Sequence, residues 1–187
     1  MIKVHYLNNS RAQRILFLLE EMGTPYQTEV FLRENGLAPT SLKNIHPLAK
    51  SPVITDGELV LTESGAIIEY LAEKYGKDTL VPAGAFDSPD MLAYKYWMHY
   101  AEGSLAPALI MQLSFVDNYL STHEWFAGGS FSAADVQIIF PLEGAARQKG
   151  ASEVYPHISA YVDRVQARPA YLRALDAGEP YAFANKN

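Results

Sequence analysis

One stretch of the chain, residues 51–64, carries the densest set of structural signals. Ser51-Pro52 leads into a short apolar strand, Asp56-Gly57 follows it, and after a second short strand Glu63-Ser64 opens an apolar helical pattern. Asp-Gly between two apolar strands is the strongest short-range signal for a β-hairpin. The stretch therefore predicts an antiparallel hairpin that leads directly into a helix. The predicted strands are 53–55 and 59–61, and the helix is capped by Ser64 and ended by Gly76.

Pro52 has two interpretations in this position. A proline that enters a strand is often only a feature of a sheet edge, since it donates no hydrogen bond. It is also where a cis peptide bond forms, which would turn the backbone N–H and C=O of Ser51 toward a ligand. The residue types alone leave both interpretations open.

The residues before the hairpin predict a strand, a helix and a second strand. Ile2, Val4 and Tyr6 alternate with polar residues, as on a half-buried strand. Asn8-Asn9-Ser10 forms a turn and cap cluster, and an apolar helical face then runs to Gly23. A second strand is predicted over 26–31 and a short, weakly patterned helix over 39–46. The first strand–helix–strand unit should pair its two strands in parallel.

The rest of the chain reads as helical. A segment with Pro82 and Gly84 predicts a linker, and a pattern rich in Ala, Met, Leu and Tyr predicts one long helix from Met91 to Leu113, kinked at Pro107. Ser132 and Asp135 resemble a capping box, and the very apolar helix that follows predicts the buried centre of this half. Further helices are predicted to start at Pro156 and Pro169. We expect domains at 1–76 and 87–187, joined by a linker at 77–86.

Composition excludes several classes of protein. The 187 residues carry 15 basic and 21 acidic side chains, a net charge of −6, which does not suit a nucleic-acid-binding protein. The chain has no cysteine, so disulfides, thiolate metal sites and cysteine nucleophiles are absent. The five histidines are not spaced as metal ligands, so we expect no metal. The sequence shows neither a signal peptide nor an apolar run long enough to cross a bilayer, which predicts a cytoplasmic protein that does not bind membranes.

Three segments together resemble the soluble, bacterial-type glutathione transferases. They are 2-IKVHYLNNSRAQRILFLLEE-21, 46-HPLAKSPVITDGELVLTESGAIIEYLAEKYG-76 and 125-WFAGGSFSAADVQIIFPLE-143. The resemblance implies an α/β thioredoxin-like N-terminal domain, an all-α C-terminal domain and a homodimer. It also implies an enzyme of detoxification that binds glutathione as co-substrate. The bound thiol would attack a hydrophobic electrophile or reduce an organic peroxide.

The resemblance also assigns roles to residues. Glu63 would bind the γ-glutamyl ammonium, and Ser64 with the N–H groups of its helix would bind the γ-glutamyl carboxylate. Ser51, before a cis Pro52, would pair its backbone with the cysteinyl unit of glutathione, and Lys50 would meet the glycine carboxylate.

The thiol would lie over the turn after the first strand. Ser10 at the start of the first helix is the first candidate to stabilise the thiolate by a hydrogen bond, and Asn9 is the second. The nucleophile is the sulfur of the bound peptide, so the protein needs no cysteine of its own.

Proteins with this fold need not be enzymes. The same fold also serves as a non-catalytic binding or regulatory protein, and the joint presence of Ser10, Ser51-Pro52 and Glu63-Ser64 favours the enzyme.

The length of the chain is also unusual for the family. Members of the family usually have more than 200 residues, and a helix that reaches Leu113 would leave too little chain for its antiparallel return. The sequence thus looks short by roughly 20–40 residues near 113–118. Family analogy further suggests that Glu102 reaches across a dimer.

Overall fold

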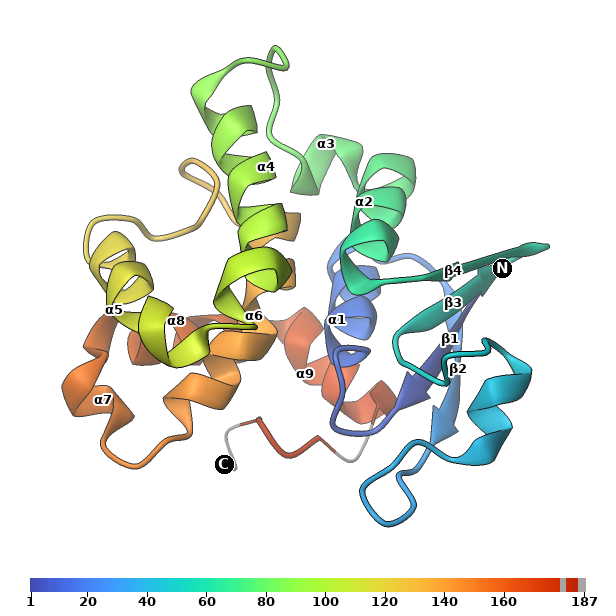
Figure 1. The fold of residues 1–187 in the computed structure, drawn as a ribbon. Coiled ribbons are helices and arrows are strands. Elements are labelled where there is room, and N and C mark those ends of the chain that lie inside the picture. Colours follow the sequence, from blue (N-terminus) through green and yellow to red (C-terminus); the bar gives the residue numbers. More distant parts are fainter. Residues whose placement is uncertain (179–180, 185–187) are drawn as a thin grey trace.

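The computed structural model describes residues 1–178 and 181–184. It combines a mixed sheet flanked by helices with a helical bundle (Figure 1). The strands are β1 (Ile2–Leu7), β2 (Tyr26–Phe31), β3 (Val53–Asp56) and β4 (Leu59–Thr62). The helices of the first part are α1 (Gln13–Met22), the 3-10 helix η1 (Thr40–Asn44), α2 (Ser64–Tyr75) and the short α3 (Lys77–Leu80). The helical bundle contains α4 (Pro89–Tyr100), a π-turn η2 (Ala101–Leu105), α5 (Leu109–Leu120), α6 (Ala133–Ala146), α7 (Ala151–Val154), α8 (Pro156–Gln166) and α9 (Pro169–Gly178).

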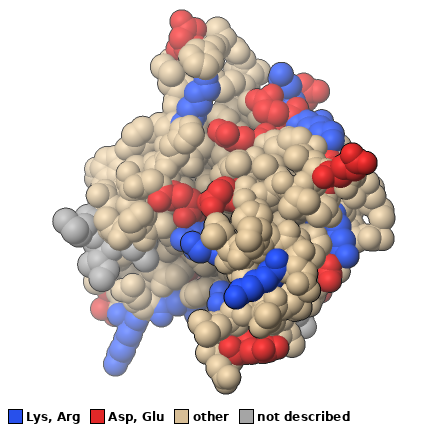
Figure 2. Space-filling model, turned by 45° about the vertical axis from the view of Figure 1, so that its right-hand side comes forward, with Lys and Arg blue, Asp and Glu red and all other residues tan. Residues whose placement is uncertain are grey.

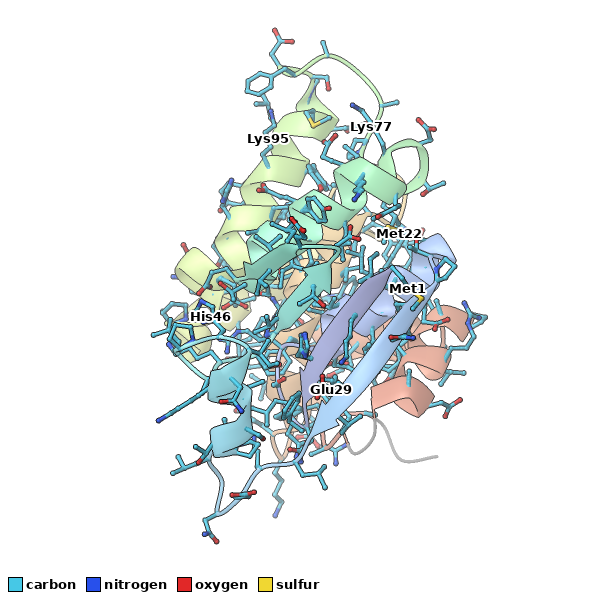
Figure 3. All side chains as sticks on the ribbon, turned by 90° about the vertical axis from the view of Figure 1, so that its right-hand side faces the viewer. Met1, Met22, Glu29, His46, Lys77 and Lys95 are labelled. Atoms are coloured by element: carbon cyan, nitrogen blue, oxygen red, sulfur yellow. The ribbon has the colours of Figure 1, made fainter. Side chains whose placement is uncertain are left out.

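The sheet has the order β2-β1-β3-β4. β1 pairs in parallel with β2, as the strand–helix–strand pattern predicted, and antiparallel with β3. The Asp56-Gly57 turn joins β3 to β4, with Gly57 at φ 62°, a left-handed conformation that glycine adopts without strain. Figure 3 views the sheet from its open side, where Glu29 marks β2 and His46 lies on the connection that leads from η1 to β3. The predicted hairpin is confirmed.

The other face of the sheet is covered by α1 and α2, and these two helices pack in turn on the bundle. α1 lies against α6 and α9, and α2 lies against α6. The central helix α6 is buried along most of its length, and its first turn carries the predicted capping box between Ser132 and Asp135. One continuous apolar core therefore runs from the sheet into the bundle. A thioredoxin-like domain and an all-helical domain are thus both present.

Three expectations about the helices are wrong. Residues 77–80 of the expected linker form α3, because Leu80 is buried in the core. The pattern from Met91 to Leu113 is not one helix: α4 ends at Tyr100, and the chain reverses through η2 into α5. Ser64 does not cap α2, because it is already the first residue of the helix, and its side chain accepts a hydrogen bond from Arg14.

Packing across the reversal explains why α4 ends early. Tyr100 donates a hydrogen bond to Gln112 (2.8 Å), and the rings of Trp97 and Tyr100 pack on Phe115 at 6.0 and 5.8 Å. These contacts require α5 to fold back on α4 within a few residues of Tyr100. The return therefore begins well before the region near 113–118 where the sequence looked short.

Candidate functional site

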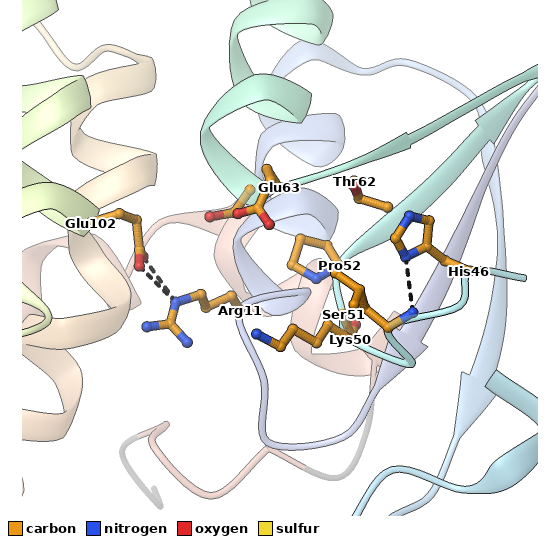
Figure 4. A pocket seen from close by; sticks show the side chains of 10 residues that line it. Arg11, His46, Lys50, Ser51, Pro52, Thr62, Glu63 and Glu102 are labelled. Carbon is orange, nitrogen blue, oxygen red and sulfur yellow. Dashed lines mark hydrogen bonds and ion pairs between the residues drawn. The ribbon is translucent and has the colours of Figure 1, made fainter. Parts of the chain in front are cut away.

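A hollow lies where the sheet meets the helical bundle, and we call it the main hollow (Figure 4). It brings together Ser51-Pro52 before β3, Glu63-Ser64 at the start of α2, and Glu102 from η2. Its lining residues are Arg11, His46, Leu48, Lys50, Ser51, Pro52, Thr62, Glu63, Ser64 and Glu102. All five residues that the sequence assigned to binding of the glutathione peptide therefore face one hollow.

The Ser51–Pro52 peptide bond is cis, which decides between the two interpretations of Pro52. The Ser51 side chain points back into the sheet, where it accepts a hydrogen bond from the Leu7 N–H and donates to the His5 carbonyl, both at 3.3 Å. Within the described residues, the backbone N–H and C=O of Ser51 make no hydrogen bond. They are thus left for a ligand that runs alongside as an added strand.

Glu63 and Ser64 differ in exposure. Glu63 is exposed and adopts φ 67°, a conformation that is costly for a residue with a side chain and that occurs mostly at functional sites. Ser64 is buried, and no side chain caps the helix that it begins. The first turn of α2 therefore presents uncapped N–H groups, which favour an anion.

A buried arginine, which sequence reasoning did not single out, supports Ser64. Nη1 of Arg14 donates to Glu102 and Gln137, both at 2.8 Å, and to Ser64 Oγ at 3.3 Å. Burial lowers the pKa of Arg14, and the Glu102 carboxylate opposes that shift. Because an arginine stays protonated even so, the site keeps a fixed positive charge beneath Ser64.

Arg11 also binds Glu102, through two hydrogen bonds of 3.0 Å from its Nε (Figure 4). Glu102 is thus held by two arginines of its own chain and faces its own hollow. The signal in the sequence was the presence of Arg11 and Arg14 three residues apart at the start of an apolar helix. In the structure Arg14 lies in the first turn of α1 and Arg11 in the turn before it, and both reach the same carboxylate.

A second hollow adjoins the first at the turn between β1 and α1, and we call it the loop hollow. It shares Arg11, Lys50 and Ser51 with the main hollow. Its lining residues are Leu7, Asn9, Ser10, Arg11, Arg33, Leu37, Ala38, Ala49, Lys50, Ser51 and Phe140. The two candidates for contact with a thiolate, Ser10 and Asn9, thus lie beside the residues assigned to the peptide.

Ser10 and Asn9 offer different groups to this hollow. The Ser10 hydroxyl is buried, donates to the Leu7 carbonyl at 2.6 Å and accepts from the Ala12 N–H at 3.1 Å. Asn9 is half-buried and adopts φ 50°. Its Oδ1 accepts a hydrogen bond of 2.7 Å from the Ala182 N–H, while its Nδ2 makes no hydrogen bond within the described residues. Of these two candidates, Asn9 therefore is the one whose side chain still has a hydrogen-bond donor for a ligand.

Tyr6 has no part in either hollow. It is fully buried on β1, and its hydroxyl donates to Gln13 at 3.1 Å. Burial raises the pKa of Tyr6, so its hydroxyl stays neutral at the core of the sheet.

Basic and acidic side chains are interspersed over the face of the protein shown in Figure 2. No extended basic patch is seen on that face, in line with the acidic composition. No helix among residues 1–178 is both long enough and apolar enough to span a bilayer.

Comparisons with known proteins agree with the geometry. Residues 1–73 match the N-terminal domain of glutathione S-transferases, and residues 104–169 match the C-terminal domain. Glutathione S-transferase 3 of Schizosaccharomyces pombe is 32% identical in an alignment that covers 96% of this chain and 88% of the relative.

Solved structures show the same relationship. A crystal structure of a glutathione S-transferase from Actinobacillus pleuropneumoniae is 30% identical with a TM-score of 0.88, and the match covers 97% of this chain and 94% of the other. A sphingomonad glutathione S-transferase complexed with glutathione shares the fold at 21% identity, with a TM-score of 0.76 over 94% of this chain and 98% of the other.

Proposed function

The chain belongs to the glutathione S-transferase family, and we propose that its main hollow holds the glutathione peptide while its loop hollow holds the sulfur and the electrophile. The protein is a glutathione transferase. The main support for the proposed site is that Lys50, Ser51-Pro52 and Glu63-Ser64 all line one hollow. A protein on this fold that does not bind glutathione would have no need for these groups together.

The two ends of glutathione find opposite charges in the main hollow. The γ-glutamyl ammonium meets the Glu63 carboxylate, and the γ-glutamyl carboxylate meets Ser64 and the uncapped first turn of α2, with Arg14 beneath. The cysteinyl unit pairs with the free backbone of Ser51. The glycine carboxylate reaches Lys50, with His46 also at this end of the hollow.

The sulfur then lies at the loop hollow, beside Asn9 and Ser10. A free thiol of this type has a pKa of about 8.5, so a lowering of one to two units requires about 1.4–2.8 kcal/mol of preference for the thiolate. A charge-assisted hydrogen bond together with the N-terminal end of α1 supplies that amount. Of the two candidates, we assign the hydrogen bond to Asn9, because the single hydroxyl proton of Ser10 is engaged by the Leu7 carbonyl.

The electrophile reaches the sulfur from the loop hollow. Leu7, Leu37 and Phe140 supply apolar surface to this hollow beside the basic Arg11, Arg33 and Lys50, which supports an electrophile with a hydrophobic part. The thiolate attacks the electrophilic carbon and forms the thioether; with an aryl halide, the carbon–halogen bond breaks and halide ion leaves. With an organic peroxide, the same thiolate would attack a peroxide oxygen and break the O–O bond, which gives the alcohol and the sulfenic acid of glutathione. A second glutathione would then react with the sulfenic acid to give glutathione disulfide and water, so peroxidase activity uses the same groups.

A homodimer is the assembly that we propose for the protein in solution. Leu92 and Tyr96 on α4 and Phe115 on α5 are about half-exposed large apolar side chains. A second copy of the chain would cover them, and light scattering at micromolar concentration measures the assembly directly. A cytoplasmic location stays a prediction, which cell fractionation tests.

The test of the proposed site is glutathione binding by calorimetry, together with conjugation of an electrophilic aryl halide. Glu63→Gln removes the charge that faces the ammonium, and we expect glutathione affinity to fall roughly 10- to 100-fold, since hydrogen bonds to charged groups contribute about 1.5–3 kcal/mol. Glu58→Gln, an exposed change on the β3–β4 turn, is the matched control and should bind as the wild type does. Wild-type protein that neither binds glutathione nor conjugates the aryl halide would contradict the proposal.

A further inference from the structure

The segment 181–184, which we call the strap, crosses beside the turn between β1 and α1. Figure 1 shows it passing below that turn, near the end of the chain. The contact that joins them is the hydrogen bond of 2.7 Å from the Ala182 N–H to Asn9 Oδ1, two residues 173 positions apart. The strap therefore touches the side chain to which we assign the thiolate contact.

This bond fixes which way the Asn9 carboxamide faces. A backbone N–H can only donate, so the group turned toward Ala182 must be the carbonyl oxygen of the carboxamide. The NH2 group is then turned away from the strap, with both of its protons left for another acceptor. An anionic sulfur in the loop hollow, which Asn9 lines, is such an acceptor.

The backbone of Asn9 is held separately, by Arg33. The Arg33 guanidinium donates to the carbonyls of Asn8 (3.1 Å) and Asn9 (3.4 Å), and the Arg33 N–H donates to Asn8 Oδ1 (2.8 Å). These contacts hold the turn with Asn9 in its left-handed conformation, which asparagine tolerates better than most residues. They do not fix the torsion of the Asn9 side chain, and the strap supplies that constraint.

The strap is itself anchored on the helical bundle. The Tyr181 hydroxyl donates to the buried Glu143 carboxylate of α6, and the Phe183 ring packs on Phe140 of α6 at 5.6 Å. The Phe183 carbonyl accepts from Gln166 at 3.2 Å, and the Ala184 carbonyl accepts from Arg147 at 2.9 Å. Each strap residue is thus held, and the Ala182 N–H has a defined direction.

We propose that the strap is a positioning element of the catalytic site: the Ala182 N–H holds the Asn9 carboxamide so that its NH2 group donates to the thiolate of bound glutathione. Ala182 acts through Asn9 and does not touch the substrate. This inference rests on the proposed function, in which Asn9 is the thiolate contact.

The experiment is a spectrophotometric pH titration of the glutathione thiol bound to wild type and variants. Ala182→Pro deletes the donor, while Ala182→Gly keeps it. Ala184→Pro places a proline in the strap without removing the N–H that reaches Asn9. Binding of S-methylglutathione, which has no ionisable thiol, reports on the main hollow alone.

The proposal expects Ala182→Pro to raise the pKa of the bound thiol by about one unit, as Asn9→Ala does. The double variant should be no worse than either single variant, because both remove the same hydrogen bond to sulfur. Ala182→Gly and Ala184→Pro should leave that pKa unchanged. S-methylglutathione should bind to all of them within about twofold of the wild-type affinity.

A second pair of variants tests the strap without a proline. Tyr181→Phe removes the strap's hydrogen bond to Glu143, and Tyr171→Phe removes one to the same carboxylate from α9. Only Tyr181→Phe should raise the pKa of the bound thiol.

Different results would overturn the role of the strap and the role of Asn9. If Asn9→Ala raises the pKa but Ala182→Pro and Tyr181→Phe leave it as in the wild type, the strap does not position Asn9 and this inference is overturned. If Asn9→Ala itself has no effect on the pKa, the thiolate contact of the proposed function is wrong and the inference falls with it.

Discussion

Arg14 is the residue whose contacts join the two halves of the protein at the site. Its side chain is fully buried, and one nitrogen serves Ser64 of α2, Glu102 of η2 and Gln137 of α6. The guanidinium lies over the Phe140 ring, 5.3 Å from its centroid, and its rigid plane fixes where that nitrogen sits, whereas an ammonium on a flexible stem is not held in this way. The position of Ser64 therefore depends on arginine in particular.

Arg14→Lys should lower both stability and glutathione affinity. The loss of contacts to buried partners should reduce the free energy of unfolding by about 2–4 kcal/mol, and the freed Ser64 should weaken glutathione binding roughly tenfold. Urea denaturation and calorimetry measure the two effects. Arg11→Lys, where 42% of the side chain is exposed, should cost less than about 1 kcal/mol of stability. Wild-type values for Arg14→Lys in both measurements would contradict this role.

The residues of the site divide into those that sequence could indicate and those that it could not. The roles of Ser51-Pro52 and Glu63-Ser64 could be assigned because the segments that hold them resemble a known family. The local patterns alone, a proline before a strand and an acid before a helix, left those roles open. The partner of the Ser10 hydroxyl could not be predicted, because it depends on the path of the backbone at Leu7. The contact between Asn9 and Ala182 joins opposite ends of the chain, so no local sequence pattern could predict it.

At the scale of elements, α2 is fixed at both ends. Its first turn faces the main hollow, and its last turn is tied to the hairpin through Asp56. The Asp56 carboxylate accepts hydrogen bonds from Tyr70 (2.9 Å), Lys74 (2.8 Å) and Tyr75 (3.1 Å). The same Asp-Gly turn that predicted the hairpin thus also holds the helix that presents Ser64.

This anchor predicts a dependence of stability on acid pH. The hydrogen bond from Lys74, followed by that from Tyr70, lowers the pKa of Asp56 to about 2 from its usual 3.8. A lowered folded-state pKa means that the stabilisation is complete above about pH 4 and is lost as the pH falls toward 2. Asp56→Asn should therefore be less stable than wild type at pH 6, and the difference should shrink between pH 4 and pH 2.

Urea denaturation across this pH range measures the difference. Glu58→Gln, on the same turn but exposed, is the matched control and should stay within about 0.5 kcal/mol of wild type at pH 6. A difference between Asp56→Asn and wild type that stays constant down to pH 2 would show that Asp56 does not anchor α2 through its charge.

The predicted ends of the helices were most accurate where a residue that starts or stops a helix stood beside a periodic apolar pattern. Gly23 ends α1, Gly76 ends α2, and the box of Ser132 and Asp135 begins α6. The reversal after Tyr100 was missed because the apolar pattern continues through it. Tertiary packing of Tyr100 on Phe115 outweighs local periodicity there.

At the scale of the whole molecule, the chain lacks internal residues that its relatives have. The alignment with the fission-yeast relative spans 216 positions, although 96% of this chain is only about 180 residues. Roughly 36 positions of the alignment thus have no counterpart here, which is similar in size to the expected 20–40 residues, although the single helix from Met91 to Leu113 behind that estimate is not formed. In this chain a tight reversal through η2 joins α4 to α5.

The shared core predicts that the protein unfolds as one unit. α1 packs on α6 and α9, and the ion pairs Arg168–Glu21 and Arg173–Glu20 cross the same boundary. Both tryptophans, Trp97 and Trp125, lie in the helical bundle, so their fluorescence reports on that half alone. Glutathione binding reports on the other half through Ser51 and Glu63.

In urea, loss of fluorescence and loss of glutathione binding should therefore have the same midpoint, as a two-state transition requires. The concentration of glutathione should be well below its dissociation constant, so that binding does not itself shift the midpoint of unfolding. Binding that disappears at a clearly lower urea concentration than the fluorescence change would mean that the sheet half unfolds separately.

The pKa of the bound glutathione thiol tests the central claim most directly. We predict that the thiol bound to wild type titrates one to two units below free glutathione, that Asn9→Ala raises its pKa by about one unit, and that Ser10→Ala has the smaller effect. A bound thiol that titrates like the free peptide would contradict activation at the turn between β1 and α1. A pKa that rises in Ser10→Ala but not in Asn9→Ala would contradict the assignment of the thiolate contact to Asn9.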